Sequence, residues 1–388
     1  VHHMVYPIPV FSDEAREAQT RRLTATEWAQ PALGVTSLSL LNVLEQVGAR
    51  ADCLGGHSFG EITALYAAGA MDASSLVKIA RKRGELMRDA GTTPGAMTAV
   101  SHGIDDLKKL LVTWGADVVT ANHNSPTQVV LSGSVTAIEE VEKKLAAEGI
   151  TAKRLPVSCA FHSPLVAGSS EPFHAFLSEI QLSQPRSVVF SNADAAPYPT
   201  EPDAIRRKLA DQIAQPVRFV EEIEAMYARG VRTFIEVGPG AVLTDLVGRI
   251  LGTRPHQAIS LDRKGKHGVT SLQEGLGRMA VTGLKLDLSP LWARFRPVDS
   301  SKPKKKPLMT VPIAGSNVGK PYPPPGGTKV LPPPNPPRAA LPAPVVAAPS
   351  TPAPAPKVAQ AASSPTAAAA PKAPSAPSGT PVQAAAPV

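Results

Sequence analysis

Apolar residues recur at two different spacings along the chain up to about residue 295. Intervals of three and four predict helices, one opening at Gln30-Pro31 with proline in the first position and another from residue 74 or 75 to about 89. A third helix is predicted to open at Pro216, with Val217 on its apolar stripe. Short apolar runs between turn residues predict buried strands at 51–54, 187–192 and 231–237. Because strands and helices alternate, we expect an α/β fold with a parallel-sheet core and helices on both faces.

Residues 95–158 follow a pattern of their own. Strands are predicted at 96–101, 117–122, 128–132 and 152–157, and helices at 105–114 and 136–148. The resulting order, βαββαβ, is the split-βαβ or ferredoxin-like arrangement. We therefore expect 95–158 to be a ferredoxin-like subdomain inserted into a core that residues 1–94 and 159–298 form together.

The composition changes abruptly at the end of this core. Residues 299–388 are rich in Pro, Ala and Ser, and they hold 24 of the 41 prolines. Such a composition cannot bury enough apolar surface to offset the entropy lost on ordering. We therefore expect a disordered Pro/Ala-rich linker here, and a tether of this length implies a further unit attached to it.

The net charge of +8 belongs to the linker. Nine of the 40 basic residues follow Asp299 without any acidic residue, so residues 1–299 hold 31 basic against 32 acidic residues. A nearly neutral globular part without a basic stripe argues against a nucleic-acid partner.

The two cysteines, Cys53 and Cys159, lie in apolar runs and are too few for a disulfide framework. They also lack metal-ligand spacing, so we expect small core residues and no bound metal or cofactor. The sequence has no signal peptide and no apolar run of about 20 residues. We therefore expect no membrane span, and by default a cytoplasmic protein.

The segment Gly56-His57-Ser58-Phe59-Gly60 contains the pattern G-x-S-x-G. It lies between a predicted strand and a helix-like apolar segment, which is the setting of a nucleophile elbow. Gly56 and Gly60 lack side chains, so strand and helix can approach closely around a strained serine. The Phe59 N–H and the helix N-terminus then face the position of a developing oxyanion. The pattern alone occurs by chance in many chains, but in this setting it predicts Ser58 as a nucleophile.

Arg83 falls on the apolar stripe of its predicted helix, together with Leu76, Ala80 and Met87. A guanidinium keeps its charge there, so it needs an anionic or strongly polar partner. Two interpretations are open at this stage: a structural ion pair, for example with Glu61, or a bidentate hold on a substrate carboxylate.

A serine nucleophile needs a general base, and His162 stands where the chain leaves the predicted insertion. His57 is adjacent to the serine and points away from it, whereas His123 and His174 remain candidates. Taken alone, a histidine before Ser163-Pro164 in an apolar turn is more typical of a buried hydrogen-bond donor than of a base.

At these positions the chain resembles the malonyl-CoA:acyl carrier protein acyltransferase family over roughly residues 5–295. The resemblance rests on six blocks in this order: Gln30-Pro31-Ala32, Gly56-His57-Ser58-Phe59-Gly60-Glu61, Arg83-Gly84 through Met87, Asn124-Ser125-Pro126, Ala160-Phe161-His162-Ser163 and Glu236-Val237-Gly238-Pro239-Gly240. It implies a hydrolase-like α/β core with an inserted ferredoxin-like subdomain.

The resemblance also implies roles for individual residues. Ser58 looks like the nucleophile that accepts the acyl group, and His162 looks like its general base. Arg83 matches the residue that holds the free carboxylate of a malonyl group. Gln212 is the position whose backbone carbonyl orients the histidine.

Three further residues are expected at the substrate on the same grounds: Gln30, Phe59 and Phe161. A phenylalanine directly before the histidine is the pattern associated with malonyl rather than methylmalonyl groups. Bulk at Phe161 would crowd a 2-methyl group, although one methyl is worth only about 1–3 kcal/mol in a pocket.

The sequence departs from the family pattern at its start. The family opens with a strand and a Gly-Gln-Gly motif, whose glutamine contributes to the oxyanion hole, and this sequence has neither. The resemblance thus implies an N-terminally truncated domain. Loss of one oxyanion donor costs about 100- to 1000-fold in rate.

We therefore expect an acyltransferase that moves a malonyl group from malonyl-CoA to the phosphopantetheine thiol of an acyl carrier protein. The coenzyme A thioester is then a substrate, and the phosphopantetheine belongs to the partner. The elbow and the Pro/Ala tail resemble the acyltransferase region of polyunsaturated fatty acid synthases and iterative type I polyketide synthases, where a ketosynthase domain lies upstream.

Two other functions are weighed against this one. A serine thioesterase or esterase explains Ser58 and His162 but gives Arg83 no purpose, and no acidic third member stands out. A non-catalytic scaffold domain is the other alternative, because the Gly-Gln-Gly motif is absent.

Overall fold

The structure is a computed structural model and describes residues 1–90, 94–157, 159–295 and 325–327. Val1–Asp299 form one compact unit, and Ser300–Val388 form a second unit. The predicted linker at 299–388 lies outside the described residues except for 325–327, so its disorder stays a prediction.

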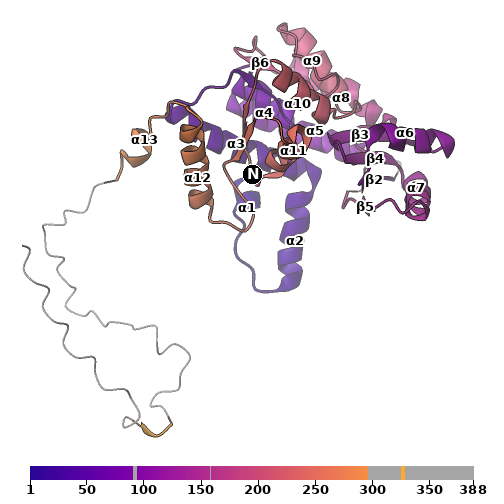
Figure 1. The fold of residues 1–388 in the computed structure, drawn as a ribbon, viewed down its shortest axis with the longest axis horizontal. Coiled ribbons are helices and arrows are strands. Elements are labelled where there is room, and N and C mark those ends of the chain that lie inside the picture. Colours follow the sequence, from indigo (N-terminus) through magenta and orange to yellow (C-terminus); the bar gives the residue numbers. More distant parts are fainter. Residues whose placement is uncertain (91–93, 158, 296–324, 328–388) are drawn as a thin grey trace, which may run out of the picture. The chain divides into compact units, whose positions relative to one another are not determined.

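The compact unit is built mainly from helices, with short strands between them (Figure 1). The helices are α1 His2–Val5, α2 Asp13–Thr24, α3 Thr26–Gln46, α4 Gly60–Ala67, α5 Ala73–Asp89, α6 Ile104–Thr113, α7 Val135–Ala147, the 3-10 helix η1 Pro164–Ser169, α8 Ser170–Ser178, α9 Pro202–Asp211, α10 Phe219–Ala228, α11 Val242–Leu251, α12 Gly268–Val281 and α13 Ser289–Trp292. The strands are β1 Cys53–Leu54, β2 Gly95–Val100, β3 Val118–Ser125, β4 Gln128–Ser134, β5 Ala152–Arg154, β6 Val188–Val189, β7 Thr233–Glu236 and β8 Gln257–Ser260.

Helix α3 begins at Thr26 and contains Pro31, so the prediction that proline occupies its first position is wrong. Proline has no N–H, and its presence leaves the Glu27 carbonyl without the usual helical partner four residues on. The Nη1 atom of Arg81, on α5, donates to this carbonyl at 3.1 Å. A tertiary hydrogen bond therefore replaces the missing helical one and allows the helix to start earlier than the sequence pattern indicates.

Helices α3 and α5 also approach closely at Gly84. A Cβ atom on Gly84 would lie 2.5 Å from the Cα atom of Glu27, so only glycine fits at this crossing. The face of α5 that turns inward carries apolar residues and Arg83, as its periodicity predicts. The arginine is thus brought into the interior by an amphipathic helix.

The predicted parallel-sheet core is seen in the described residues as two short parallel ladders and one isolated parallel bridge. Strand β1 pairs with β6 over two residues, and β7 pairs with β8 over four. The run at 51–54 ends as a strand at Leu54, because Gly55 begins the turn toward Ser58. The run at 187–192 is cut short where Phe190 bridges to Pro197. The apolar runs therefore overestimate the strand lengths.

Within residues 95–154, four strands form an antiparallel sheet with the order β3-β4-β2-β5. The elements follow one another as β-α-β-β-α-β, the order that the sequence predicts. Helix α7 packs on β2, β4 and β5, and the apolar residues between the helices and the sheet form a core of their own.

A backbone bridge ties this sheet to the segment before α10. Val217 donates its N–H to the Ala121 carbonyl at 2.8 Å and accepts from the His123 N–H at 2.9 Å. Because these groups pair with β3, α10 starts at Phe219, and the prediction that it opens at Pro216 is wrong. The part of β3 that pairs with Val217 ends at His123, one residue before Asn124, whose side chain contacts His57 of the elbow.

Among residues 1–90, 94–157 and 159–295, no helix has both the length and the apolar character needed to cross a bilayer. In the same part of the chain, no three His, Cys, Asp or Glu side chains gather as a metal site. Cys159 is buried and donates its thiol to the Met87 carbonyl, whereas Cys53 is half-buried.

Candidate active site

Ser58 lies in the sharp turn between β1 and α4, with φ at +52°. A non-glycine residue in this left-handed region is strained, which is typical of a nucleophile elbow. A Cβ atom on Gly56 would lie 2.1 Å from the Gly60 carbonyl carbon, so position 56 requires glycine. A Cβ atom on Gly60 would meet nothing within 4 Å, so the predicted need for glycine at position 60 is wrong.

His162 and Ser58 form a hydrogen-bonded pair, with Nε2 and Oγ 2.8 Å apart. The Nδ1 atom of His162 lies 2.9 Å from the Gln215 carbonyl and 3.3 Å from the Gln212 carbonyl. Because carbonyl oxygens only accept, Nδ1 carries the ring proton and Nε2 accepts the serine hydroxyl. The pair is thus arranged for transfer of the Ser58 proton to the imidazole.

The orientation of His162 is shared by two backbone carbonyls. The family pattern points to Gln212, but the closer carbonyl belongs to Gln215, which the pattern does not single out. None of the described carboxylates is hydrogen-bonded to His162.

Burial lowers the pKa of His162 to about 3, and the charge of Arg83 and the nearby His57 add to this effect. The imidazole is therefore neutral at physiological pH and can accept a proton. His57 points elsewhere: its Nε2 lies 2.7 Å from Asn124 Oδ1, and burial lowers its pKa as well.

Arg83 is 1% exposed and reaches the same place from α5. It donates through Nη1 to Gln30 Oε1 at 3.0 Å and through Nη2 to Gln212 Oε1 at 2.8 Å. Nη2 also lies 3.3 Å from Ser58 Oγ. Burial lowers the pKa of Arg83 to about 10, so the guanidinium stays protonated at neutral pH.

A direct Arg83–Glu61 ion pair is not formed. The two carboxylate oxygens of Glu61 accept instead from the Asn192 N–H and the Tyr198 hydroxyl. All acceptors of Arg83 in the described part of the chain are neutral, and its Nε has no acceptor there. A buried cation of this kind is poised to hold an anionic group beside Ser58.

The remaining predicted residues take different positions. Gln30 donates to Thr26 Oγ1 at 2.8 Å and uses its Oε1 to hold Arg83, so it supports the guanidinium directly. The Phe59 side chain is buried, and its N–H has no acceptor among the described residues. Phe161 is half-buried and packs against two of the apolar clusters.

Asn192 is a site residue that the sequence pattern does not predict, and its side chain contacts the backbone on both sides of His57. Its only signal in the sequence is its place at the end of a predicted strand. The side-chain amide of Gln212, which binds Arg83, is likewise found only in the structure.

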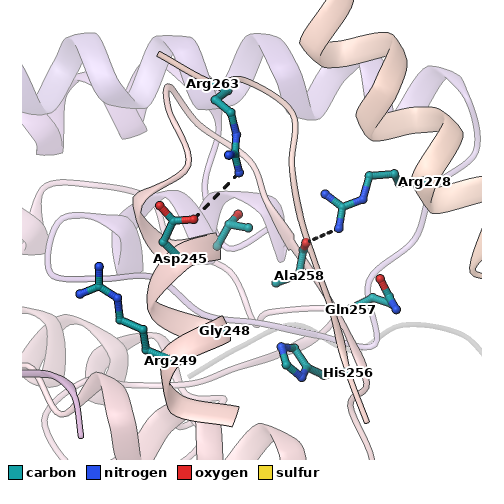
Figure 2. A pocket seen from close by; sticks show the side chains of 9 residues that line it. Asp245, Gly248, Arg249, His256, Gln257, Ala258, Arg263 and Arg278 are labelled. Carbon is teal, nitrogen blue, oxygen red and sulfur yellow. Dashed lines mark hydrogen bonds and ion pairs between the residues drawn. The ribbon is translucent and has the colours of Figure 1, made fainter. Parts of the chain in front are cut away.

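A polar groove lies elsewhere on the compact unit, between α11, β8 and α12 (Figure 2). Its volume is about 520 Å³, and Arg249, Arg263 and Arg278 line it. Arg278 donates to the Ala258 carbonyl at 2.9 Å, and Arg263 lies 3.9 Å from Asp245. This groove shares no residue with the Ser58 site.

Comparisons with known proteins all point to the same family. The sequence profile of the family described as "Acyl transferase domain" matches residues 11–285. The malonyl CoA-acyl carrier protein transacylase of Bacillus subtilis is 37% identical over 241 residues, which are 60% of this chain and 75% of that protein. A polyunsaturated fatty acid synthase chain of a Thraustochytrium species is 30% identical over 299 residues, which are 75% of this chain but 10% of that protein.

Solved structures show the same likeness. The acyltransferase domain from the second module of the salinomycin polyketide synthase aligns with a TM-score of 0.66 and 30% identity, covering 75% of this chain and 69% of that domain. An acyl carrier protein S-malonyltransferase from Vibrio cholerae aligns with a TM-score of 0.60 and 33% identity, covering 66% of this chain and 82% of that protein.

Proposed function

Because the chain belongs to the acyl transferase domain family, we propose that it moves a malonyl group from malonyl-CoA to an acyl carrier protein thiol. The observation that carries this proposal is a buried guanidinium, Arg83, 3.3 Å from the nucleophilic oxygen of Ser58. Its described partners are neutral, so it offers a full positive charge to the free carboxylate of a dicarboxylic acyl group.

The first half of the reaction acylates the enzyme. His162 Nε2 takes the proton of Ser58 while Oγ attacks the thioester carbonyl. The Phe59 N–H, which has no other described acceptor, faces the developing oxyanion at the start of α4. When the tetrahedral intermediate collapses, the C–S bond breaks, and coenzyme A leaves with the proton held by His162.

The second half returns the enzyme to its starting state. The phosphopantetheine thiol of the carrier protein gives its proton to His162 and attacks the acyl-serine carbonyl. The C–O bond to Ser58 breaks, and Oγ regains the proton from the imidazole. The malonyl group ends as a thioester on the carrier protein, and no cofactor is consumed.

Two groups of side chains tune this site. Gln30 and Gln212 hold the guanidinium of Arg83 in place through their amide oxygens. Phe161, next to His162, limits bulk at the second carbon of the acyl group and so favours malonyl over methylmalonyl groups. The Gln212 and Gln215 carbonyls keep the imidazole in the tautomer that accepts from Ser58.

The two alternatives are less well supported. A serine thioesterase or esterase has no use for a buried arginine beside its nucleophile. A non-catalytic scaffold has no need for a serine and a histidine that are hydrogen-bonded at 2.8 Å in strained backbone conformations.

We also infer how the chain is divided. Residues 95–158 are a ferredoxin-like subdomain inserted in the hydrolase-like core of 1–94 and 159–298, a division that the antiparallel sheet supports. Residues 299–388 are a linker within a cytoplasmic multidomain synthase of fatty acid or polyketide type, in which an upstream ketosynthase domain and carrier-protein domains are the partners. The relatives include such synthases, of which the chain covers a small share.

Transfer to a carrier protein tests the proposal. The full chain is incubated with malonyl-CoA and a phosphopantetheinylated acyl carrier protein, and the carrier is weighed by intact mass spectrometry. We expect a malonyl adduct on the carrier with the wild-type chain, and none above the uncatalysed level with Ser58→Ala. Release of free malonate with no carrier adduct would instead support a hydrolase, and no turnover of a folded chain would support a scaffold.

A further inference from the structure

Asn192 lies just beyond β6, fully buried, 134 residues away in sequence from the serine that it contacts. We propose that Asn192 is a positioning residue that clamps the nucleophile elbow from both sides and so sets the reactivity of Ser58. This inference rests on the proposed function of Ser58 as a nucleophile.

The side chain of Asn192 makes two hydrogen bonds to the elbow backbone. Its Oδ1 accepts from the Ser58 N–H at 2.6 Å, and its Nδ2 donates to the Gly56 carbonyl at 2.7 Å. One planar amide thus spans the peptide units before and after His57. These two contacts fix the turn in which Ser58 holds a φ of +52°.

The orientation of this amide follows from its backbone partners. The Ser58 N–H can only donate, so it must face the oxygen, and the Gly56 carbonyl can only accept, so it must face the nitrogen. Both contacts select the same orientation. Nδ2 also donates to Glu222 Oε2, and this third hydrogen bond is compatible with the same orientation of the amide.

Asn192 is in turn held by two buried glutamates. Its backbone N–H donates to Glu61, whose second oxygen accepts from the Tyr198 hydroxyl at 2.6 Å. Burial raises the pKa of Glu61 to about 7, and burial together with Glu61 raises the pKa of Glu222. The elbow therefore rests on a connected polar network in the interior, in which hydrogen bonds are stronger than in water.

Asparagine is well matched to this position because one acceptor and one donor are needed on the same plane. An ionised aspartate of the same size would place an oxygen against the Gly56 carbonyl and beside Glu222. Leucine would leave a buried N–H and a buried carbonyl without partners. Because the Ser58 N–H is already used by Asn192, the clamp also leaves the Phe59 N–H as the elbow donor free for an oxyanion.

The test measures the reactivity of Ser58 by two independent routes in the full chain. A fluorophosphonate probe labels Ser58 without using malonyl recognition, and malonyl-CoA acylates it in single-turnover experiments. The variants are Asn192→Ala, Asn192→Leu and Asn192→Asp. Matched controls are Asn42→Ala and Asn42→Asp, which make the same changes at an exposed asparagine of α3.

We expect Asn192→Ala and Asn192→Leu to lower both rates about 100-fold, because a displacement near 1 Å in a reacting group costs about that much. The KM for malonyl-CoA should change less than threefold, since Arg83 is untouched. The Asn42 variants should react at the wild-type rate.

The aspartate variant separates positioning from folding. At pH 8 it should be as slow as Asn192→Ala, and as pH falls to 5.5 its rate relative to wild type should recover at least tenfold. A protonated carboxyl group again offers one donor and one acceptor, and burial of position 192 favours that uncharged form. His162 stays neutral over this range because its pKa is about 3.

Folded Asn192 variants that label within threefold of wild type at pH 8 would overturn the proposal. An Asn192→Asp variant whose labelling rate relative to wild type does not change with pH would also overturn it. A wild-type chain that reacts with the fluorophosphonate but not with malonyl-CoA would contradict the proposed function alone, and the probe rates of the variants would still decide the role of Asn192.

Discussion

Burial gives His162 a neutral imidazole well below the pH at which a free histidine becomes protonated. Because its pKa is lowered to about 3, the base form is fully present from pH 8 down to pH 5 and is lost only as pH falls toward 3. We therefore predict that the single-turnover rate of acylation by malonyl-CoA is nearly constant between pH 5 and 8.

A fall in this rate with a midpoint between pH 6 and 7 that persists in the Glu61→Gln variant would contradict the account of His162. Glu61 has a pKa of about 7 and accepts a hydrogen bond from the Asn192 N–H. The effect of its titration on the rate must therefore be separated from that of His162. The Glu61→Gln variant provides that control: a midpoint that disappears in the variant belongs to Glu61, and one that persists belongs to His162.

Individual site residues differ in how far the sequence predicts them. Ser58, His162 and Arg83 stand in short blocks with recognisable spacing, and the structure brings the three together. Asn192 contacts Ser58 and Gln215 contacts His162, but both lie in turns whose direction depends on tertiary packing. Local patterns carry no information about which turn residue reaches back to an elbow more than 100 residues away.

At the scale of elements, helix boundaries depend on contacts that a local pattern does not contain. Pro31 reads as the first residue of a helix, yet Arg81 of α5 satisfies the Glu27 carbonyl and α3 extends back to Thr26. Val217 reads as helical, yet β3 takes its backbone groups. The types of these elements are predicted correctly, and the errors lie at their ends.

The crossing of α3 and α5 provides a test of packing. Gly84→Ala places a Cβ atom 2.5 Å from the Glu27 backbone, which cannot yield as a flexible side chain does. We predict a loss of about 1–3 kcal/mol in the free energy of unfolding, as is usual for overpacking. The measurement is urea unfolding followed by circular dichroism.

Gly277→Ala is the matched control, since Gly277 lies in α12 and a Cβ atom there meets nothing within 4 Å. This variant should stabilise the chain by about 0.5–1 kcal/mol through helix propensity. If both variants changed stability by the same amount, the close approach at Gly84 would not be the cause.

At the scale of the whole molecule, every residue of the candidate site lies within Val1–Asp299, which form one compact unit. The sequence predicts a boundary at residue 299, because the composition changes sharply there. The sequence overestimates the lengths of the parallel strands, because apolar runs do not reveal where a strand stops pairing.

Removal of residues 300–388 should therefore leave the acylation of Ser58 unchanged within about twofold. The measurement is the rate of malonyl adduct formation on the shortened chain, with thermal unfolding as a check on its integrity. A shortened chain that stays folded but loads malonyl groups more than tenfold slower would show that the compact unit is not sufficient for the site.

The central claim is that Arg83 selects an acyl group with a free carboxylate, and competition between two thioesters tests it most directly. The chain is exposed briefly to an equal mixture of malonyl-CoA and acetyl-CoA and then weighed intact. The variants are Arg83→Ala and Arg83→Gln, and Arg88→Ala is the control, because Arg88 is an exposed arginine of the same helix.

Wild type and Arg88→Ala should carry the malonyl adduct almost exclusively. The Arg83 variants should lose malonyl loading about 100- to 1000-fold, which is usual when one partner of a buried charge pair is removed, and should carry acetyl groups instead. Folded Arg83 variants that still prefer malonyl groups would contradict the account.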